Sequence, residues 1–134
     1  MTQKTANTLT GRPILIVESF ELRQTVALNA KIFSIGRHPK CSLVINNKMI
    51  SRHHATIAWL EDKDNEQKYA YWLIDGKGQR QRSRNGVFVN GKKTVLHRLR
   101  SGDIISLGNE TKITYNYIAD TTENSHISDT VYYL

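Results

Sequence analysis

The sequence predicts an all-β protein built as a sandwich or a barrel, and three observations support this fold class. Residues that favour strands (Val, Ile, Thr, Tyr, Phe and Trp) gather in short runs bounded by Gly, Asn, Asp and Lys. Turn signals separate the runs, most clearly Asn90-Gly91, because a two-residue hairpin turn needs positive φ at both central residues. No window shows the repeated i, i+3, i+4 and i+7 apolar spacing of an amphipathic helix. Many short strands separated by turns therefore predict a sandwich or barrel.

Nine segments have the composition of strands. The alternation is clearest from 55 to 61, where every second side chain can enter a core. Trp59 and Phe88 are expected in the core, and Cys41 is expected to pack as a small hydrophobic residue. The nine expected strands are Ile14–Ser19, Glu21–Leu28, Lys31–Ile35, Ser42–Ile45, Ala55–Glu61, Tyr69–Asp75, Val87–Val89, Ile104–Leu107 and Lys112–Ile118.

Length and composition indicate a single domain. A chain of 134 residues can bury a core without disulfides or metals. We expect the sandwich at residues 11–118, with polar tails at 1–10 and 119–134. No apolar run approaches the roughly 18 residues of a membrane helix, and "PILIV" is shorter than the roughly 7 to 15 residues of a signal-peptide core. The single cysteine fits a reducing compartment, so a cytoplasmic protein is expected.

The charge of the chain favours anionic partners. Nineteen Lys and Arg residues stand against twelve Asp and Glu residues, a formal net charge of +7, and the densest cluster is "KGQRQRSR" at 77–84. A basic surface concentrates anions, whether these are phosphates on a protein or on a nucleic acid. Charge alone does not choose between these partners, and a solvated loop would also account for the cluster.

Three segments, "IGRHPK", "MISRHH" and "RSRNG", carry polar residues that packing does not require. Loops of a sandwich cluster at the ends of its sheets, so segments distant in sequence can meet there. Guanidinium groups, hydroxyls and an amide with no carboxylate are suited to hold an anion, because each can donate hydrogen bonds to it. If the three loops meet, the residues brought together are Arg37, Ser51, Arg52, Ser83, Arg84 and Asn85.

Enzymatic and metal chemistry are poorly supported. A hydrolase would need Ser51 activated by His53 or His54, but adjacent residues of a strand point to opposite faces and no glycine elbow surrounds the serine. The five histidines lack the spacing of metal ligands. We therefore predict no catalytic residue, no metal and no cofactor. Nucleic-acid binding stays open, with Tyr69, Tyr71 and Trp72 as stacking platforms, although core packing is the better account of these aromatic residues.

Four motifs together resemble the forkhead-associated (FHA) domain. They are "GR" at 36–37, "SRHH" at 51–54, "SRNGVFVNG" at 83–91 and "LRSGDIISLG" at 99–108. They occur in the family's order, within about Ile14 to Ile118. The resemblance implies a β-sandwich of eleven strands in two mainly antiparallel twisted sheets. It also implies recognition loops at one end that bind phosphothreonine in a partner peptide.

The resemblance implies a role for each matching residue of the recognition loops. Arg37 would pair with the phosphate, Ser51 would donate its hydroxyl to a phosphate oxygen, and Arg52 would add charge or a backbone contact. Asn85 would hold the main chain of the peptide. His54 would brace the loop that presents Ser51. Structural support would come from Gly36 and Gly86, expected to permit tight turns through positive φ, and from the hairpin residues Asn90 and Gly91.

Two features depart from the family pattern. The residue before Asn85 is Arg84, and the hydroxyl that could reach a phosphate, that of Ser83, comes one position earlier. The segment between Asp75 and Ser83, "GKGQRQR", is longer than the usual link. Our hypothesis is that this loop selects acidic residues C-terminal to the phosphothreonine, through Lys77, Arg80 and Arg82.

The sequence thus favours a phosphothreonine-dependent adaptor or regulator in Ser/Thr kinase signalling. The alternatives are a scaffold that uses the same fold without phosphate, and a basic nucleic-acid-binding protein. The tail threonines Thr121, Thr122 and Thr130 lie near acidic residues. If phosphorylated, one of them could enter the site of its own chain or of a neighbour.

Overall fold

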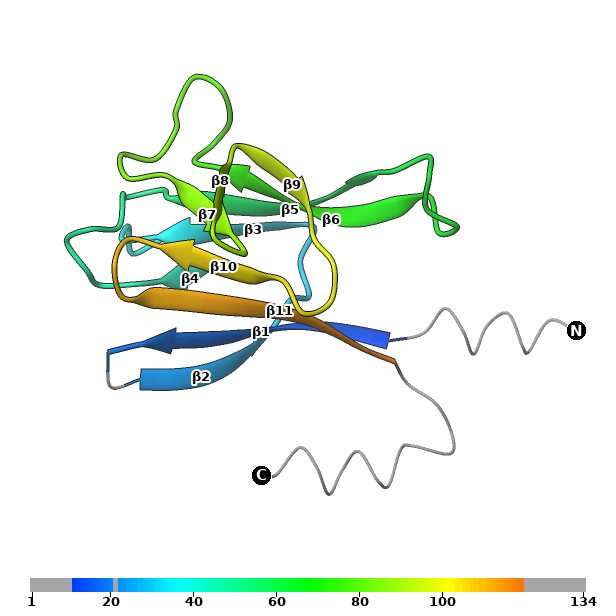
Figure 1. The fold of residues 1–134 in the computed structure, drawn as a ribbon, viewed down its shortest axis with the longest axis horizontal. Helices are drawn as coiled ribbons and strands as arrows, with labels where there is room; N and C mark the ends of the chain where they lie inside the picture. The colour runs from blue at the N-terminus through cyan, green and yellow to red at the C-terminus, as the bar shows by residue number, and fades with distance from the viewer. Residues whose placement is uncertain (1–10, 21, 120–134) are drawn as a thin grey trace, which may run out of the picture.

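The computed structural model describes residues 11–20 and 22–119, which form eleven β-strands in two sheets (Figure 1). One sheet has six strands in the order β2-β1-β11-β10-β7-β8, and the other has five in the order β4-β3-β5-β6-β9. Neighbouring strands are antiparallel, except that β3 and β4 are parallel. The strands are β1 (Gly11–Ser19), β2 (Leu22–Ala27), β3 (Ile32–Gly36), β4 (Leu43–Val44), β5 (Ala55–Glu61), β6 (Tyr69–Asp75), β7 (Val87–Val89), β8 (Lys92–Thr94), β9 (Leu96–Arg98), β10 (Ile104–Leu107) and β11 (Thr111–Ala119).

The predicted β-sandwich is confirmed, and each of the nine expected strands is present. β1 starts earlier than expected, at Gly11, because it pairs with β11 as far as Ala119. The tails predicted at 1–10 and 119–134 fall outside the described residues, apart from Ala119. In the part of the chain that the structure describes, no helix is long and apolar enough to cross a membrane.

The core lies between the facing sides of the two sheets. Leu15 and Val17 of β1 are buried while their neighbours are half-buried, as the two-residue period of a strand requires. From the other sheet, Ile35, Ile57 and Leu73 have no exposed surface. Burying each such side chain stabilises the fold by about 1.5–3 kcal/mol, so the core holds the frame that carries the loops.

The sequence prediction missed two strands, β8 and β9. Both have three residues, and each forms the edge of its sheet. Their sequences, "KKT" and "LHR", carry charge and no apolar alternation. Charged, short edge strands prevent pairing with other chains, and the same features hide them from a search for apolar periodicity.

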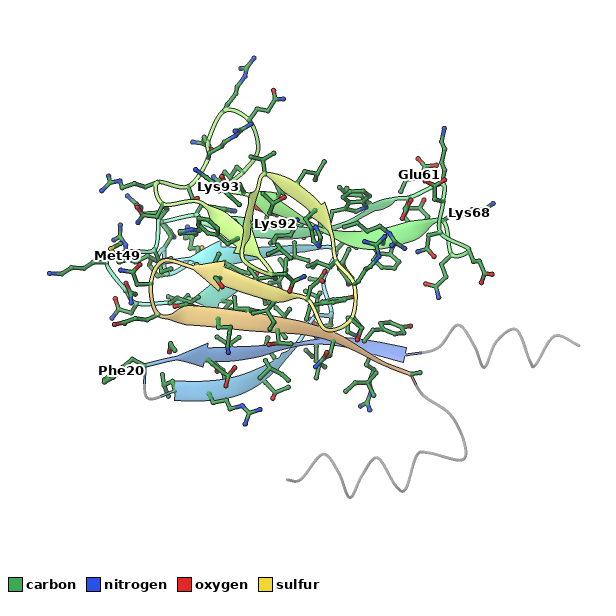
Figure 2. The ribbon with its side chains drawn as sticks, in the orientation of Figure 1. Phe20, Met49, Glu61, Lys68, Lys92 and Lys93 are labelled. Atoms are coloured by element: carbon green, nitrogen blue, oxygen red, sulfur yellow. The ribbon has the colours of Figure 1, made fainter. Side chains whose placement is uncertain are left out.

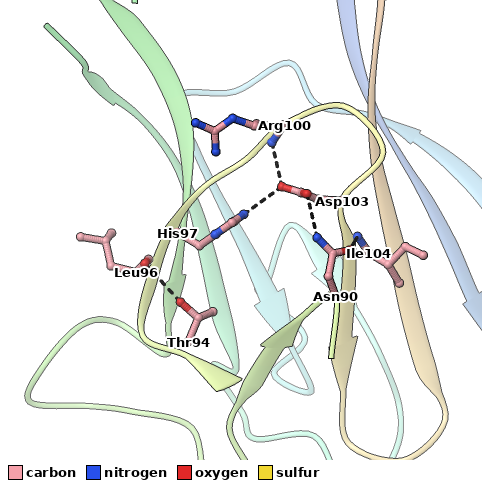
Figure 3. A network of polar contacts seen from close by, with 7 residues as sticks. All are labelled: Asn90, Thr94, Leu96, His97, Arg100, Asp103 and Ile104. Carbon is pink, nitrogen blue, oxygen red and sulfur yellow. Dashed lines mark hydrogen bonds and ion pairs between the residues drawn. The ribbon is translucent and has the colours of Figure 1, made fainter. Parts of the chain in front are cut away.

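The predicted hairpin turn at Asn90-Gly91 is confirmed. Asn90 has φ 51° and Gly91 has φ 86°, the positive values of a two-residue turn between β7 and β8. A buried carboxylate, Asp103, holds this turn (Figure 3). It accepts hydrogen bonds from Asn90 Nδ2 at 3.0 Å, His97 Nε2 at 2.8 Å and the Arg100 amide at 2.8 Å.

The hydrogen bonds to Asp103 also set its protonation state. Burial alone would raise the pKa of this carboxyl, but the bonds from His97, Arg100 and Asn90 outweigh burial and lower the pKa below its ordinary value. The ionised carboxylate therefore ties β9, β10 and the β7–β8 turn together. This network fixes the position of β7. The segment "SRNG" at 83–86 directly precedes β7 in the sequence.

Some aromatic residues are less buried than expected. Trp59 is half-buried because it lies at the far end of β5, where it stacks on Tyr69 (centroids 6.0 Å apart) and contacts Tyr71 (4.7 Å). Tyr69 is 45% exposed. Phe88 is also half-buried, because its neighbours Val87 and Val89 take the inward positions of β7. Complete core packing was therefore wrong for these residues.

The two ends of the sandwich differ. Three loops, at residues 37–42, 45–54 and 76–86, gather at the end that we call the apical end (Figure 1). The loop between β5 and β6, residues 62–68, lies at the opposite end, as the positions of Met49 and Lys68 show (Figure 2). The loop between β6 and β7 rises above the sandwich. The predicted phosphopeptide-binding residues all belong to the apical loops, whereas the supporting residues Asn90 and Gly91 lie in the β7–β8 turn.

Candidate functional site

Backbone hydrogen bonds join the three apical loops. The amides of Arg37 and His38 donate to the carbonyls of Ser51 and Arg52, each at 3.0 Å. The Arg84 amide donates to Ser51 Oγ at 2.9 Å. The structure therefore brings the loops at 37–42, 45–54 and 76–86 into one site, as the sequence suggested.

The Arg37 guanidinium is hydrogen-bonded at Nε, and its two terminal nitrogens are open. Its Nε donates to the carbonyl of Ile50 at 3.0 Å. The side chain is exposed, and its terminal guanidinium nitrogens have no partner among the described residues. The Nε bond orients the guanidinium, so its outer edge can grip two oxygens of an anion.

The Ser51 hydroxyl has a proton that its own loop contacts leave unused. Its Oγ accepts the hydrogen bond from the Arg84 amide, so its own proton is not used in that bond. No acceptor among the described residues takes that proton. The Ser51 hydroxyl is therefore positioned as a donor, which is what an incoming phosphate oxygen needs.

His54 positions Ser51 without activating it. The histidine is fully buried, and its Nδ1 accepts a hydrogen bond from the Ser51 amide at 2.9 Å. The proton must then lie on Nε2, which donates to the carbonyl of Gly86 at 2.8 Å. Burial lowers the pKa of His54 and outweighs the Gly86 hydrogen bond and the charge of Asp75, both of which raise it. Both ring nitrogens serve backbone groups, so neither can take a proton from Ser51 Oγ.

Two glycines support the site for different reasons. Gly86 has φ +86°, a conformation that favours glycine, as expected. Gly36 does not have positive φ, so the expected turn was wrong. A Cβ at Gly36 would lie 2.2 Å from the carbonyl oxygen of Arg52. Glycine is needed there because β3 passes directly against the backbone of the Ser51–His54 segment.

Ser83 faces into its own loop. Its hydroxyl donates to Asp75 Oδ1 at 2.5 Å and accepts from the Gly86 amide at 2.9 Å. The Ser83 amide donates to the same carboxylate oxygen at 3.0 Å. With its single proton committed to Asp75, Ser83 has no donor left for a phosphate. The geometry does not support the expected phosphate contact and gives Ser83 a structural position.

The remaining predicted residues face solvent. Asn85 Nδ2 donates to the carbonyl of Met49 at 2.9 Å, which leaves its Oδ1 and second amide hydrogen for other groups. Arg52 and Arg84 have exposed side chains. The carbonyl of Arg52 is occupied by Cys41 Sγ at 3.3 Å, so Cys41 caps the backbone of the recognition loop.

The long loop at 76–82 is an ordered turn. The Lys77 amide donates a hydrogen bond to the carbonyl of Gln81 at 2.8 Å. The Gln81 amide donates to the carbonyl of Gly78 at 3.1 Å. Lys77 and Arg82 line a groove of about 760 Å³ next to Ser51, whereas Arg80 is exposed outside it. The structure thus separates the three cations that the sequence grouped together.

Sequence reasoning missed several residues of this groove. His53, for which the sequence left open a solvent-facing position or a place along the peptide path, is half-buried in this groove, and its Nε2 lies 2.9 Å from Thr56 Oγ1. Thr56 gives its own proton to the carbonyl of Gly76 at 2.7 Å, so His53 Nε2 is the donor. His38 and Lys40 line the opposite side. Their basic character in a loop was the only signal in the sequence.

Among residues 11–20 and 22–119, no group of three His, Cys, Asp or Glu side chains could hold a metal ion. The groups that the site presents are hydrogen-bond donors and cations, such as the Arg37 guanidinium and the Ser51 hydroxyl. The three loops at residues 36–54 and 76–86 contain eight Lys and Arg residues and no Asp or Glu. These are Arg37, Lys40, Lys48, Arg52, Lys77, Arg80, Arg82 and Arg84.

Comparison with known proteins gives a family match. The family model described as the FHA domain matches residues 33–108. The chain is 36% identical over 104 residues to the uncharacterized protein sll1895 of Synechocystis, and 30% identical over 104 residues to the DNA damage response protein kinase DUN1 of Saccharomyces cerevisiae. These matches cover 78% and 75% of this chain. They span only 15% and 19% of the two relatives.

Solved structures agree with the match. The crystal structure of the Slr1951 protein from Synechocystis is similar with a TM-score of 0.68 and 34% identity, over 78% of this chain and 97% of that one. The yeast Dun1 FHA domain, solved in complex with a doubly phosphorylated (pT) peptide derived from Rad53, is similar with a TM-score of 0.62 and 27% identity. That likeness covers 84% of this chain and 79% of the other.

Proposed function

The chain belongs to the FHA domain family, whose members are phosphothreonine-binding modules, and we propose that it binds threonine-phosphorylated proteins as a cytoplasmic adaptor or regulator in Ser/Thr kinase signalling. The observation that carries this proposal is the pairing of two oriented donors at the apical end. The Arg37 guanidinium and the Ser51 hydroxyl are each fixed by a hydrogen bond on the inner side and have donors left on the outer side.

In this proposal, each exposed residue of the site has one role. Arg37 pairs with two phosphate oxygens, and Ser51 donates to a phosphate oxygen. Arg52 and Arg84 add positive charge beside the phosphate. Asn85 holds the peptide main chain with its free Oδ1 and second amide hydrogen, while its bond to the Met49 carbonyl keeps it in place.

The chemistry of phosphate explains why such a site distinguishes modified from unmodified threonine. Phosphorylation adds about −1.5 to −2 charge and three strong acceptor oxygens. A hydrogen bond to a charged group contributes roughly 1.5–3 kcal/mol. The unmodified hydroxyl offers neither the charge nor the three acceptors, so the oriented donors would lack partners.

The structures of relatives support the ligand class. The Dun1 FHA domain is solved with a phosphorylated peptide, and another FHA structure, with 25% identity to this chain, is described as part of a study of phosphothreonine-dependent FHA domain interactions. The tail threonines Thr121, Thr122 and Thr130 lie outside the described residues. We keep them as candidate ligands of the same site after phosphorylation.

The alternatives are less well supported. A scaffold that ignores phosphate would have no use for the unpaired donors of Arg37 and Ser51. A nucleic-acid platform would need cations and aromatic faces together. The basic loops lie at the apical end, whereas Tyr69, Tyr71 and Trp72 belong to the first half of β6, which follows the β5–β6 turn at the opposite end.

A parallel capture experiment tests the proposal. Wild-type protein and Arg37→Ala are used to capture partners from cell lysate, with half of each lysate treated with phosphatase. We expect partners that bind only wild-type protein and only in untreated lysate. An identical set of partners in all four samples would contradict the proposal.

A further inference from the structure

The end of the sandwich opposite the apical loops carries two adjoining hollows that the proposed function does not use. Their volumes are about 280 and 390 Å³. Four residues line both of them: Trp59, Gln67, Tyr71 and Tyr117. We call the two hollows together the basal groove. None of the predicted phosphopeptide-binding residues lines it, so its occupant need not compete with a phosphopeptide.

The basal groove is lined by aromatic side chains that the sandwich leaves partly uncovered. Trp59 lies on the same face of β5 as the buried Ile57, and Tyr69 and Tyr71 lie on the same face of β6 as the buried Leu73, because side chains two positions apart in a strand point to one side. Tyr69 is nevertheless 45% exposed, and Trp59 and Tyr71 are half-buried. The core-facing side of the β5–β6 hairpin therefore ends in aromatic surface that no described strand covers completely.

Contacts with neighbouring elements hold the lining in place. The Tyr71 hydroxyl donates to the carbonyl of Ala30 at 3.2 Å, which ties its ring to the β2–β3 loop. The Tyr117 ring lies against Gly11, where a Cβ would collide with it. Glycine at this position therefore makes room for the ring at the edge of the groove. The groove is formed by the described residues alone, before any segment binds it.

Fifteen further residues, 120–134, follow the end of β11 at Ala119. Ala119 pairs with Gly11, and Gly11 lines the groove. The segment therefore starts at the rim of the basal groove. An extended chain gains at most about 3.3–3.6 Å per residue, so residues 120–126 give Ile127 ample reach to return to the groove.

The composition of the segment fits the groove. Residues 127–134, "ISDTVYYL", contain five apolar or aromatic residues, one acid and no Lys or Arg. Such side chains gain free energy by packing on aromatic rings. The lining includes Lys31 and Arg100 and no Asp or Glu, so Asp129 would meet cations there. Residues 1–10 fit less well, because they hold three apolar residues and a lysine.

We propose that residues 127–134 dock in the basal groove of their own chain, with apolar and aromatic side chains packed on Trp59, Tyr69 and Tyr71. The inference goes beyond the proposed function and does not depend on it, since the groove and the phosphopeptide-binding residues lie at opposite ends of the sandwich. Docking would cover the aromatic surface that the strands leave exposed. While the segment is docked, Thr130 is held away from the apical site of its own chain.

Nuclear magnetic resonance of the 134-residue chain tests the proposal. The measured quantities are the nuclear Overhauser contacts between residues 127–134 and the Trp59 ring, and the signal of the Trp59 indole N–H. Tyr69→Ser removes an exposed ring from the groove. Phe20→Ser is the matched control, because the Phe20 ring is 73% exposed and does not line the groove. Thermal unfolding shows whether each variant is folded.

We expect the contacts with Trp59 in wild-type protein and in Phe20→Ser, and their loss in Tyr69→Ser. Val131→Ser/Tyr133→Ser alters no described residue, so it leaves the sandwich intact. This double variant should also lose the contacts, and it should shift the Trp59 indole signal.

Absence of the contacts in wild-type protein, or contacts that persist in a folded Tyr69→Ser, would overturn the proposal. A mixture of isotope-labelled and unlabelled protein separates contacts within a chain from contacts between copies. Contacts between copies alone would assign the groove to a neighbour's segment, and contacts of Trp59 with residues 1–10 would assign it to the other tail. Either result would also overturn the proposal, and none of these outcomes bears on phosphothreonine binding at the apical end.

Discussion

At the scale of single residues, a serine can donate a hydrogen bond to a phosphate only if its hydroxyl proton has no acceptor within the protein. Ser51 and Ser83 are both serines of the apical loops, and both lie next to backbone amides that donate to them. Ser83 gives its proton to Asp75, whereas the proton of Ser51 has no described acceptor. The one sign of this difference in the sequence is that Ser83 comes one position earlier than the hydroxyl of the family pattern. The hydrogen bonds that each serine makes could not be predicted, because they depend on how the loops fold together.

This difference predicts opposite behaviour for two matched substitutions. Ser51→Ala should weaken phosphopeptide binding by tenfold or more, because a bond to a charged group worth roughly 1.5–3 kcal/mol is lost, with little change in the melting temperature. Ser83→Ala should lower the free energy of unfolding by roughly 1–3 kcal/mol, because it leaves the buried Asp75 carboxylate short of a donor. Calorimetric titration and thermal unfolding of both variants check this. A loss of affinity in Ser83→Ala at unchanged stability would contradict the assignment.

At the scale of elements, β5 connects the core to the site. It begins directly after His54, which hydrogen-bonds the Ser51 amide and the Gly86 carbonyl and so joins two recognition loops. A doubly protonated His54 could not accept from Ser51. The fold and the site therefore depend on the same neutral imidazole.

This dependence predicts that stability falls on acidification. The pKa of His54 is lowered in the folded state, so the unfolded chain binds the proton more readily and folding loses free energy as pH falls below about 6.5. The loss grows until the pH reaches the folded-state pKa. His54→Asn can still accept from Ser51 and does not titrate, so its unfolding free energy should change less between pH 7.5 and 5.5. Urea unfolding at these two pH values measures both slopes, and equal slopes would refute this role.

Element by element, the sequence predicts the strands whose side chains alternate around the core, such as β5 and β6, with their observed ends. It does not reveal β8 and β9. These edge strands form by hydrogen-bonding to a neighbouring strand, and they lack the apolar alternation that burial produces. At the site, motif spacing identifies the residues that meet. The groove between the loops at 37–42 and 76–82 could not be predicted, since its shape depends on hydrogen bonds such as that between Lys77 and Gln81.

At the scale of the whole molecule, charge is divided between the two ends. The apical loops hold eight cations and no acid, while residues 61–68 at the opposite end hold four acids and two lysines. Glu61 and Lys68 mark that opposite end in Figure 2. Such a distribution directs an anionic partner towards the recognition loops before contact is made.

Steering of this kind predicts a dependence on salt and on the position of charge. Raising the ionic strength shortens the screening length from about 10 Å at 0.1 M to about 3 Å at 1 M, so the association rate of a phosphopeptide should fall severalfold. Lys48→Ala removes an exposed apical lysine and should slow association without changing dissociation. Lys63→Ala removes an exposed lysine from the opposite end and should change neither rate. Stopped-flow binding measures both rates, and equal effects of the two substitutions would refute steering.

The most direct test of phosphothreonine recognition is a calorimetric titration of one peptide, selected from a phosphothreonine library, in its phosphorylated and unphosphorylated forms. Wild-type protein and Arg37→Ala are compared, with thermal unfolding to show that both are folded. We expect binding of the phosphorylated form to wild-type protein, at least tenfold weaker binding to Arg37→Ala, and no detectable binding of the unphosphorylated form. Equal affinity for the two forms, or full affinity in a folded Arg37→Ala, would contradict recognition of the phosphate by Arg37 and Ser51.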